Sequence, residues 1–437
     1  MLKLLSKMVL FVFIVLLFSL SFTSFTLAIS VSESNIDTTY MVEDMVVDSS
    51  GNIHTVVIQS VSQTANNLVY KKYNGSSWSA TTVSSTVNIS YYASIKLDSS
   101  GNPGIAFAEW NSGVGTRALY YKKYNGSTWG TTVEVETGMD NASGRPALEF
   151  YKEDVDANYP TIFTCHGSTY IVEEHKATGS GTEPTFAAPA SVSNNNDHDC
   201  SSIDAHISAT DYREIVISPK GSPGTTAYAL SNDGSGWNAS TLFTSVDVIN
   251  GSVIFLDYDG SEYHAVIIDD ASASTTDNIL YSKMSGGSWS AQETVVSGAR
   301  LGQNYVDIVA DTDNSIPYVL YFDNANNLLK YSYKQNGSWT AGTIDSGFSL
   351  GTMQGDYNNF VAGDYYSGGS KLIVLGTQYL SGPPKSFEFN KYDLTGLPTQ
   401  SQEGSGVPEF STYMYTLILI MGFGFLYRRF GGEFSLR

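Results

Sequence analysis

Two nearly identical nine-residue stretches, YKKYNGSSW (70–78) and YKKYNGSTW (121–129), lie 51 positions apart. Similar segments ending in tryptophan recur later as DGSGW, GGSW and NGSW. The tryptophans stand at positions 78, 129, 237, 289 and 339, and the spacings between successive ones are 51, 108, 52 and 50 residues. A repeat of about 50 residues constrains the fold more than any other feature, because every copy must form the same supersecondary unit.

The long spacing equals about two periods, so a degenerate copy is expected inside it. TGSGTEPTF (178–186) fits that place, with Phe186 where tryptophan would stand. FEFNKYDLTGL (387–397) reads as a last copy, with Leu397 in the tryptophan position. The chain therefore contains seven units, five clear and two eroded.

A second marker keeps the same period as the first. It reads VDSSGN (47–52), LDSSGN (97–102), LDYDGS (256–261) and ADTDNS (310–315). Alternating apolar and polar residues flank both markers, and turn-forming Gly, Asn, Asp and Ser separate them, which is typical of short strands joined by hairpins. Four strands per unit, named A to D, and seven units predict an all-β fold, a seven-bladed β-propeller. A solenoid is the alternative, and a blade suits four strands better.

The N-terminal segment is predicted to close the ring. ISVSES (29–34) aligns, at an offset of 50, with the D-strand region TTVSST (81–86), whereas the seventh unit ends in TGLPTQSQEGSG, a poor strand. The outer strand of the last blade should therefore come from the N-terminal segment.

Both ends of the chain carry apolar stretches. Residues 1–28 have two lysines, an apolar run and small residues near Ala28, as a secretory signal peptide does. Residues 411–429 are apolar up to Arg428 and predict a transmembrane segment, with a cytoplasmic tail at 430–437. Between them lie the propeller (29–397) and a polar stalk (398–410). These features predict an exported protein at the cell surface, anchored by its C-terminus with the propeller outside.

The C-terminal region resembles a known sorting signal. Val407 is followed by Pro408, Glu409 and Phe410, then by the apolar span and two arginines. This order is similar to the PEF-CTERM signals of surface proteins. The resemblance implies recognition by an archaeosortase- or exosortase-type transpeptidase and removal of the tail, and a plain membrane anchor stays open.

Charge and cysteine content limit the partners. Without the signal and the tail 428–437, the chain has 23 − 2 − 3 = 18 basic and 43 − 1 = 42 acidic residues, a net charge of −24. This excludes a nucleic-acid partner, whose phosphates need Lys and Arg. Cys165 and Cys200 predict one disulfide between adjacent blades. The alternative is a metal site with the nearby His166, Asp197, His198, Asp199 and His206, but no zinc-like spacing supports it.

Two weaker motifs concern cofactors and modification. LDYDGSEYH and ADTDNS could turn oxygens toward calcium, but no distal acid stands at fixed spacing, so no cofactor is expected and calcium is left open. Seven Asn-X-Ser sequons are glycosylation candidates, and turn chemistry explains several of them equally well. They begin at Asn74, Asn88, Asn125, Asn141, Asn238, Asn250 and Asn336.

Ligand contacts are predicted on the face formed by the longer and more varied B–C and D–A loops. Trp110, Arg117, Arg145 and Arg300 fall there and are the binding candidates, with ordinary loop salt bridges as the alternative for the arginines. No catalytic motif is recognised: the turns differ from the Asp-box of sialidases, and the sialidase Arg-Ile-Pro motif is missing.

The repeat of the form L-D-x-x-G-N-P…Y-x-x-Y-N-G-S-W resembles exported bacterial and archaeal repeats, which are similar to cell-surface propeller modules and propeller lectins. The resemblance implies a non-catalytic binding or adhesion protein for glycans or envelope proteins. The alternatives are a glycan hydrolase of sialidase-like layout, which would make the chain an enzyme, and a purely structural envelope protein.

Overall fold

A computed structural model describes residues 29–399 except for gaps in the connecting segments. The gaps are 38–39, 61–65, 86–91, 112–115, 140–144, 153–157, 167–170, 180, 193–199, 201, 209–211, 219–225, 247–253, 270–276, 300–305, 324–325, 327, 347–360 and 382–385. The predicted signal peptide, sorting motif and apolar C-terminal segment lie outside the described residues.

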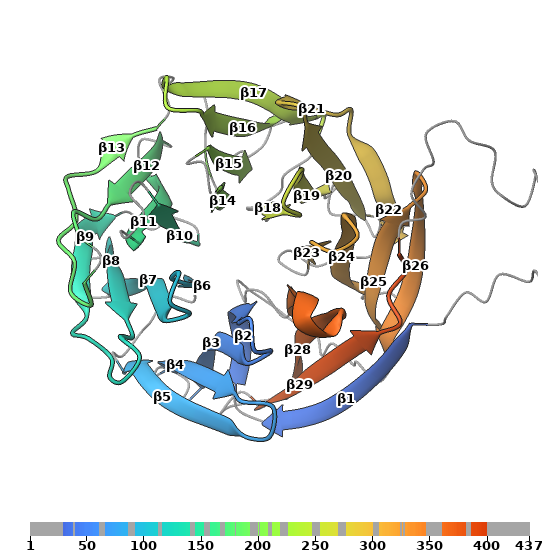
Figure 1. The fold of residues 1–437 in the computed structure, drawn as a ribbon, viewed down its shortest axis with the longest axis horizontal. Coiled ribbons are helices and arrows are strands. Elements are labelled where there is room, and N and C mark those ends of the chain that lie inside the picture. The colour runs from blue at the N-terminus through green and yellow to red at the C-terminus, as the bar shows by residue number, and fades with distance from the viewer. Residues whose placement is uncertain are drawn as a thin grey trace, which may run out of the picture. The chain divides into compact units, whose positions relative to one another are not determined.

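The described residues form seven antiparallel sheets arranged in a ring, each with its first strand nearest the centre (Figure 1). The prediction of a seven-bladed propeller with four strands per blade is confirmed, and in blade 5 the outer strand is divided into two segments that both pair with the third strand. The strands, blade by blade, are β2 (Tyr40–Val47), β3 (Ile53–Ser60), β4 (Asn66–Tyr73), β5 (Trp78–Ser84); β6 (Tyr92–Leu97), β7 (Pro103–Asn111), β8 (Thr116–Lys123), β9 (Val133–Met139); β10 (Ala147–Lys152), β11 (Asn158–His166), β12 (Ile171–Lys176), β13 (Ala190–Ser191); β14 (Ser202–Ile207), β15 (Arg213–Ser218), β16 (Thr226–Asn232), β17 (Trp237–Thr244); β18 (Ile254–Tyr258), β19 (Tyr263–Asp269), β20 (Asp277–Ser285), β21 (Ser288–Trp289), β22 (Glu293–Ala299); β23 (Val306–Asp311), β24 (Ile316–Asp323), β25 (Leu328–Gln335), β26 (Ser338–Asp345); and β27 (Val361–Tyr366), β28 (Lys371–Ser381), β29 (Ser386–Thr395), β1 (Ser30–Asp37). A short 3-10 turn, η1 (Ser367–Gly369), joins β27 to β28.

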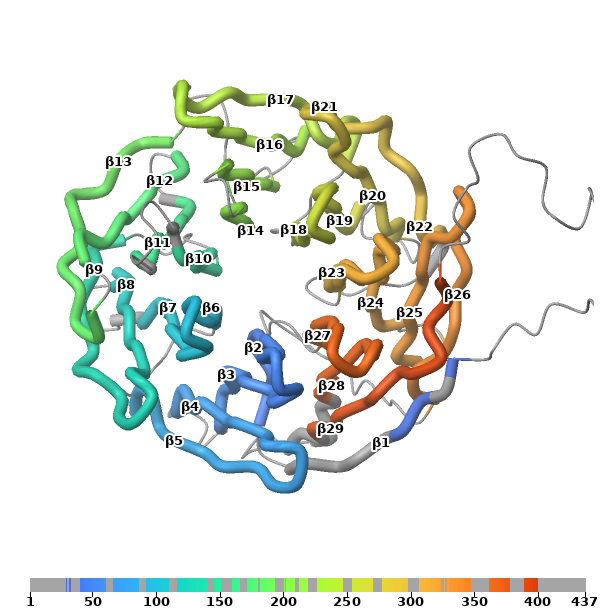
Figure 2. Tube along the Cα trace, viewed as in Figure 1, coloured from blue at the N-terminus to red at the C-terminus, as the bar shows by residue number. Residues whose placement is uncertain are grey.

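The ring is closed by the N-terminal strand, as predicted. β1 pairs antiparallel with β29, with Ser30 opposite Thr395 and Ser34 opposite Lys391. Figure 2 shows the first and last strands of the chain side by side in this blade. Closure of this kind makes the N- and C-terminal ends of the propeller depend on each other.

The repeated sequence markers form the turns. Asp48 Oδ1 accepts the backbone N–H groups of Ser50 (2.9 Å) and Asn52 (2.8 Å) in the A–B turn of blade 1. Asp98 does the same in blade 2. Gly51 and Gly101 have φ of 80° and 76°, a left-handed conformation that favours glycine.

At several blade junctions the repeated tryptophan, or the residue in its place, packs against an aromatic ring of the preceding blade. Trp129 stands edge-on to Tyr70, and Trp339 edge-on to Tyr281, each with ring centroids 4.9 Å apart. Phe186 fills the same position against Tyr121 at 5.6 Å, which confirms the eroded third copy. The repeat is thus an aromatic contact that joins successive blades.

The inner strands are joined round the central axis by carboxylates. In Asp204 of blade 4, Oδ1 accepts the N–H of Ala205 and Oδ2 accepts the N–H of Leu256 in blade 5, both at 2.9 Å. Asp44, Asp257, Asp307 and Asp364 repeat this bridge toward the next blade. Each bridge provides an acceptor for backbone N–H groups that would otherwise be buried at the blade edge without a hydrogen bond.

The predicted disulfide is confirmed. Cys165 on β11 is bonded to Cys200, which stands just before β14, with a Cα–Cα distance of 5.4 Å. Both residues are fully buried, and the bond joins blade 3 to blade 4.

The predicted C-terminal membrane anchor has to be corrected. Within the described ranges of the chain, no helix is both long and apolar enough to cross a membrane. The segment 411–429 on which the anchor and the cell-surface location were based lies outside those ranges, so the structure gives that location no support.

Candidate functional site: a groove between blades 4 and 5

A groove with a volume of about 410 Å³ opens between blades 4 and 5, on the face that carries the A–B and C–D turns. Its walls combine two aromatic rings with carboxylate, amide and hydroxyl groups. The lining residues are Tyr212, Ser231, Asp233, Asn238, Ala239, Ser240, Thr241, Gly287, Ser288 and Trp289.

The aromatic wall is held from beneath by a buried carboxyl group. Trp289 Nε1 donates a hydrogen bond to Glu214 Oε1 over 3.1 Å. Glu214 lies on β15 and has no exposed surface. Burial raises the pKa of its carboxyl group to about 7, although the polar groups of Ser231, Trp289 and Tyr212 nearby partly oppose this rise.

The support for the repeated tryptophan of the next blade is built differently in blades 1 and 5. In blade 1, His54 Nε2 lies 3.2 Å from Asp48 Oδ2, and its Nδ1 lies 2.7 Å from the hydroxyl of Tyr70. Blade 5 repeats this relay with Asp259, His264 and Tyr281, at 3.1 and 2.8 Å. Both histidines are buried, and they fix the tyrosine against which the next blade's tryptophan packs.

Blade 4 lacks this chain of hydrogen bonds from aspartate through histidine to tyrosine. Strand pairing sets Val56 opposite Tyr70, Val266 opposite Tyr281 and Val216 opposite Ala229. Ala229 therefore takes the place of the tyrosine, and Glu214, two residues before Val216, takes the place of the histidine. Trp289 donates to Glu214 here, whereas its counterparts Trp129 and Trp339 pack on tyrosine.

Asp233 supplies a charged group at the rim of the groove. It lies in the C–D turn, where its Oδ1 accepts hydrogen bonds from the backbone N–H and the hydroxyl of Ser235. These bonds lower the pKa of Asp233 below its usual value. Burial raises the pKa of the Tyr212 hydroxyl, and the charges of Glu214 and Asp233 add to this rise.

The predicted binding residues lie elsewhere. Trp110 on β7 stands opposite Arg117 on β8, and the Arg117 guanidinium lies over the ring of Tyr92 at 5.1 Å. Arg300 lies outside the described residues. The groove was not predicted, since the sequence favoured the opposite face of the propeller.

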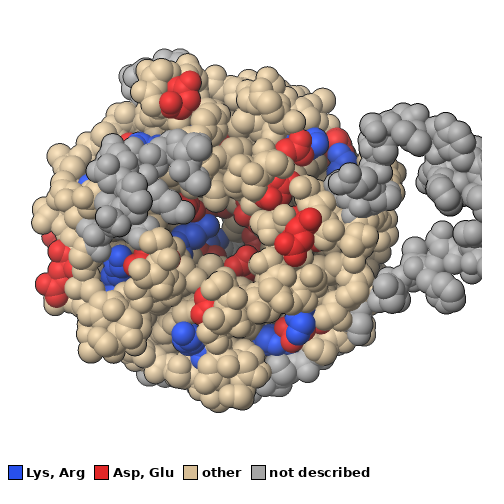
Figure 3. All heavy atoms as spheres, viewed as in Figure 1, with Lys and Arg blue, Asp and Glu red and all other residues tan. Residues whose placement is uncertain are grey.

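Arg145 lies among the carboxylates at the axis. Its Nη2 is 2.6 Å from Asp44 Oδ2, and its guanidinium lies 5.5 Å from the ring of Phe255 in blade 5. Lys96 pairs with Glu149 at 3.0 Å nearby. Figure 3 shows blue atoms in the central hollow with red atoms around them. Arg145 is thus ion-paired within the protein, and its role in ligand binding stays a prediction.

The remaining sequence candidates are partly placed. Asn74 and Asn125 cap C–D turns by accepting two backbone N–H groups each, and Asn336 lies in such a turn with φ of 51°. Asn238 lines the groove. Asn88, Asn141, Asn250, Pro408, Glu409 and Phe410 lie outside the described residues. The turn aspartates proposed for calcium, such as Asp259, accept backbone N–H groups of their own turns.

Comparison with known proteins shows only the fold. No family model and no curated protein matches the chain. Solved propellers of similar architecture include the GH93 α-L-arabinofuranosidase of Fusarium graminearum in complex with arabinobiose, at 11% identity and a TM-score of 0.49, covering 82% of this chain and 97% of that one. The Aleuria aurantia lectin matches at 12% identity and a TM-score of 0.45, covering 72% and 98%. The β-propeller domain of the Trilobed protease from Pyrococcus furiosus matches at 10% identity and a TM-score of 0.43, covering 81% and 95%.

The prediction that the chain is not an enzyme is therefore corrected. The solved propellers that it resembles include a glycoside hydrolase as well as a lectin, so the architecture on which that prediction rested does not exclude catalysis.

Proposed function

We propose that the protein acts on carbohydrate and recognises it in the groove between blades 4 and 5. The observation that carries this proposal is the composition of the groove, which is lined by Trp289 and Tyr212 together with a carboxylate, an amide and several hydroxyls. Sugars present C–H groups that pack on aromatic rings and hydroxyls that donate to carboxylates and amides, so this mixture suits them.

The size of the groove agrees with a short saccharide. Its volume of about 410 Å³ lies within the roughly 300–1,000 Å³ that is typical of small-ligand sites. The hydrogen bond from Trp289 to Glu214 fixes the plane of the indole before a ligand arrives. A fixed ring loses little entropy on binding, which favours affinity.

Hydrolysis of the bound saccharide is the second candidate. Glycosidases use a carboxylic acid with a raised pKa beside a carboxylate that stays ionised. Glu214 has a pKa of about 7 and Asp233 has a lowered pKa, and both carboxyl groups contribute to the raised pKa of Tyr212. Because Glu214 is buried, Tyr212 or Trp289 would have to move before it could reach a glycosidic oxygen.

The experiment is a glycan array read with the purified protein, followed by a reducing-sugar assay on each bound glycan. The test variants are Trp289→Ala and Asp233→Asn. Trp339→Ala is the matched control, because Trp339 holds the equivalent position in blade 6. All variants are first checked for an intact fold by circular dichroism and thermal melting.

The proposal expects specific glycan binding that Trp289→Ala and Asp233→Asn weaken by at least about ten-fold and that Trp339→Ala preserves. Release of reducing ends that both Asp233→Asn and Glu214→Gln abolish would add the hydrolase role. A folded protein that binds no glycan, or binding that the two test variants leave unchanged, would overturn the proposal.

A further inference from the structure

The groove between blades 4 and 5 carries charge of one sign. Among its ten described lining residues, Asp233 is the charged side chain, and none is a lysine, arginine or histidine. Asp233 is exposed, so its charge lies at the rim where a ligand enters. The sign of this charge limits the sugars that the groove can accept.

The turn that contains Asp233 does not need a charged residue. Asp233 Oδ1 accepts the backbone N–H of Ser235 at 3.0 Å and its hydroxyl at 2.5 Å. In blade 2 the same turn is built with Asn125, whose Oδ1 accepts the N–H of Ser127 at 3.0 Å and its hydroxyl at 2.8 Å. A neutral amide caps this turn as well as a carboxylate does, so the charge in blade 4 is available for another role.

One oxygen of Asp233 is left over by the turn. Both hydrogen bonds from Ser235 go to Oδ1, and Oδ2 accepts none from the part of the chain that the structure describes. The hydrogen bonds from Ser235 hold the pKa of Asp233 below its usual value, so the carboxylate is ionised at neutral pH. Oδ2 can therefore accept a hydrogen bond from a ligand at the rim of the groove.

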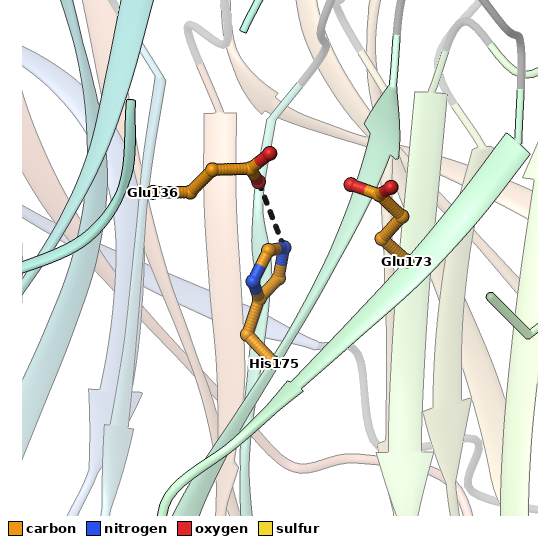
Figure 4. Close-up of side chains that lie close together, drawn as sticks. All are labelled: Glu136, Glu173 and His175. Atoms are coloured by element: carbon orange, nitrogen blue, oxygen red, sulfur yellow. Dashed lines mark ion pairs between the residues drawn. The ribbon is translucent and has the colours of Figure 1, made fainter. Parts of the chain in front are cut away.

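Carboxylates at other blade junctions are paired inside the protein. Between blades 2 and 3, Glu136 Oε2 lies 3.3 Å from His175 Nε2, and Figure 4 shows this contact beside Glu173. Between blades 5 and 6, Glu293 Oε1 lies 2.6 Å from Lys334 Nζ. Asp233 differs from these glutamates, because it has no ion pair with any described residue.

The described cations of blades 4 and 5 are engaged elsewhere. Arg213 Nη1 lies 2.6 Å from Glu174 Oε1 of blade 3, and Lys283 Nζ lies 2.8 Å from Glu262 Oε2. These are the lysine and arginine side chains of the two blades within the described ranges, where nine Asp and Glu outnumber them. Proteins bind carboxylate and sulfate groups chiefly through Arg and Lys, so an anionic sugar lacks a counter-charge at the groove.

The three charge classes of sugar meet Asp233 differently. A neutral sugar donates a hydroxyl to Oδ2, and an amino sugar adds the attraction of its ammonium group to the carboxylate and to the aromatic rings of Trp289 and Tyr212. A sugar that bears a carboxylate or sulfate brings a second negative charge to the same place. Like charges set against each other are a common means of rejecting a wrong ligand.

We infer that Asp233 makes the groove select neutral and amino sugars and reject sugars that bear a carboxylate or sulfate group. This inference rests on the proposed function, because it specifies the class of carbohydrate that the same groove accepts. Asp233 is then a specificity-determining residue, and sialic acids and uronic acids are excluded from the groove.

The test compares matched glycans that differ in one charged group. The neutral glycan that binds best on the array is titrated into the full chain by calorimetry. Its uronic-acid counterpart, with a carboxylate in place of a CH₂OH group, and its amino counterpart, with an ammonium in place of a hydroxyl, are titrated in the same way. Each titration is run at about 0.01 M and at about 1 M salt, where the Debye length is roughly 30 Å and 3 Å.

The variants change the charge of the turn without removing its cap. Asp233→Asn copies the turn of blade 2, and Asp233→Lys reverses the sign of the charge. The matched control is Asn125→Asp, which adds a carboxylate at the equivalent position of blade 2 and alters net charge away from the groove. Circular dichroism and thermal melting first confirm that each variant is folded.

At low salt the wild type should bind the neutral glycan at least about ten-fold more tightly than the uronic acid, a modest effect for opposed like charges. The ratio should shrink at high salt and in Asp233→Asn, reverse in Asp233→Lys and stay unchanged in Asn125→Asp. A wild type that binds the uronic acid as tightly as the neutral glycan overturns this inference and leaves the proposed function standing. So does a ratio that Asp233→Asn and Asp233→Lys leave unchanged, whereas a folded chain that binds none of the glycans overturns both.

Discussion

Trp289 of blade 5 donates its indole N–H to the buried Glu214 of blade 4 over 3.1 Å. At the junctions after blades 1 and 5, the corresponding tryptophan stands edge-on to a tyrosine that a buried histidine holds. The junction after blade 4 thus keeps the tryptophan, but a carboxyl group supports it in place of the tyrosine and histidine. A groove about 410 Å³ in volume lies beside this junction.

The first prediction concerns protonation of Glu214. Since its pKa is about 7, the carboxyl group ionises around neutral pH, and the hydrogen bond from Trp289 strengthens as the acceptor becomes charged. We expect the indole N–H resonance of Trp289 to shift with a midpoint near pH 7 in an NMR titration. Glu214→Gln should keep the acceptor and lose the titration, and a wild-type resonance that does not move between pH 5 and 9 would contradict the account.

The second prediction concerns stability against pH. Burial raises the pKa of Asp204 to about 6 and of Asp364 to about 7. A raised carboxyl pKa means that the folded state binds protons more tightly than the unfolded state, so stability falls as pH rises from about 4 to about 7. We expect the free energy of unfolding, measured in urea, to be lower at pH 8 than at pH 5 by more than about 1 kcal/mol.

Asp364→Asn tests the source of this pH dependence, because asparagine cannot ionise. The variant should show a shallower decline between pH 5 and pH 8 than the wild type. The pKa of Asp48 is lowered, because hydrogen bonds, first from Asn52, outweigh burial. Asp48 therefore changes the free energy of unfolding only below about pH 4, outside the range from pH 5 to pH 8. A wild type that is equally stable at both pH values would rule the interpretation out.

The third prediction concerns the disulfide. Cys165 and Cys200 are 35 residues apart, and closing a loop of that length contributes roughly 3–4 kcal/mol in the chain-entropy model. The double variant Cys165→Ser/Cys200→Ser should lose about that much unfolding free energy in urea. The wild type under reducing conditions should behave like the variant, and an unchanged urea midpoint in both would be the opposite result.

The fourth prediction concerns closure of the ring. Val31 on β1 packs against the largest apolar cluster, whereas its neighbour Ser32 is exposed. Val31→Asp places a charge at the seam between β1 and β29 and should lower the melting temperature by several degrees. Ser32→Asp is the control and should leave it nearly unchanged. Equal effects of the two substitutions would mean that the N-terminal strand does not seal the ring.

The fold could be predicted from the sequence because the repeated residues have structural roles at fixed positions in each blade. The turns require a left-handed backbone at positions such as Gly51, and glycine adopts it readily. The tryptophan every 50 residues joins blade to blade. Even the eroded copy ending in Phe186 could be placed, since its ring does the same packing.

The groove could not be predicted in the same way. Glu214 and Ala229 are unremarkable in the sequence. Only the register of strand pairing shows that they occupy in blade 4 the positions that His54 and Tyr70 occupy in blade 1. One signal was present: the residue eight positions before the repeated tryptophan is tyrosine in units 1, 2, 5 and 6, and alanine at 229.

The most direct measurement of the central claim is a crystal structure of the protein with its best-bound saccharide from the array. We expect a sugar ring packed on the indole of Trp289, with a hydroxyl donating to Asp233, between blades 4 and 5. Sugar at the central axis among Arg145 and the aspartates, with the groove empty, would contradict it.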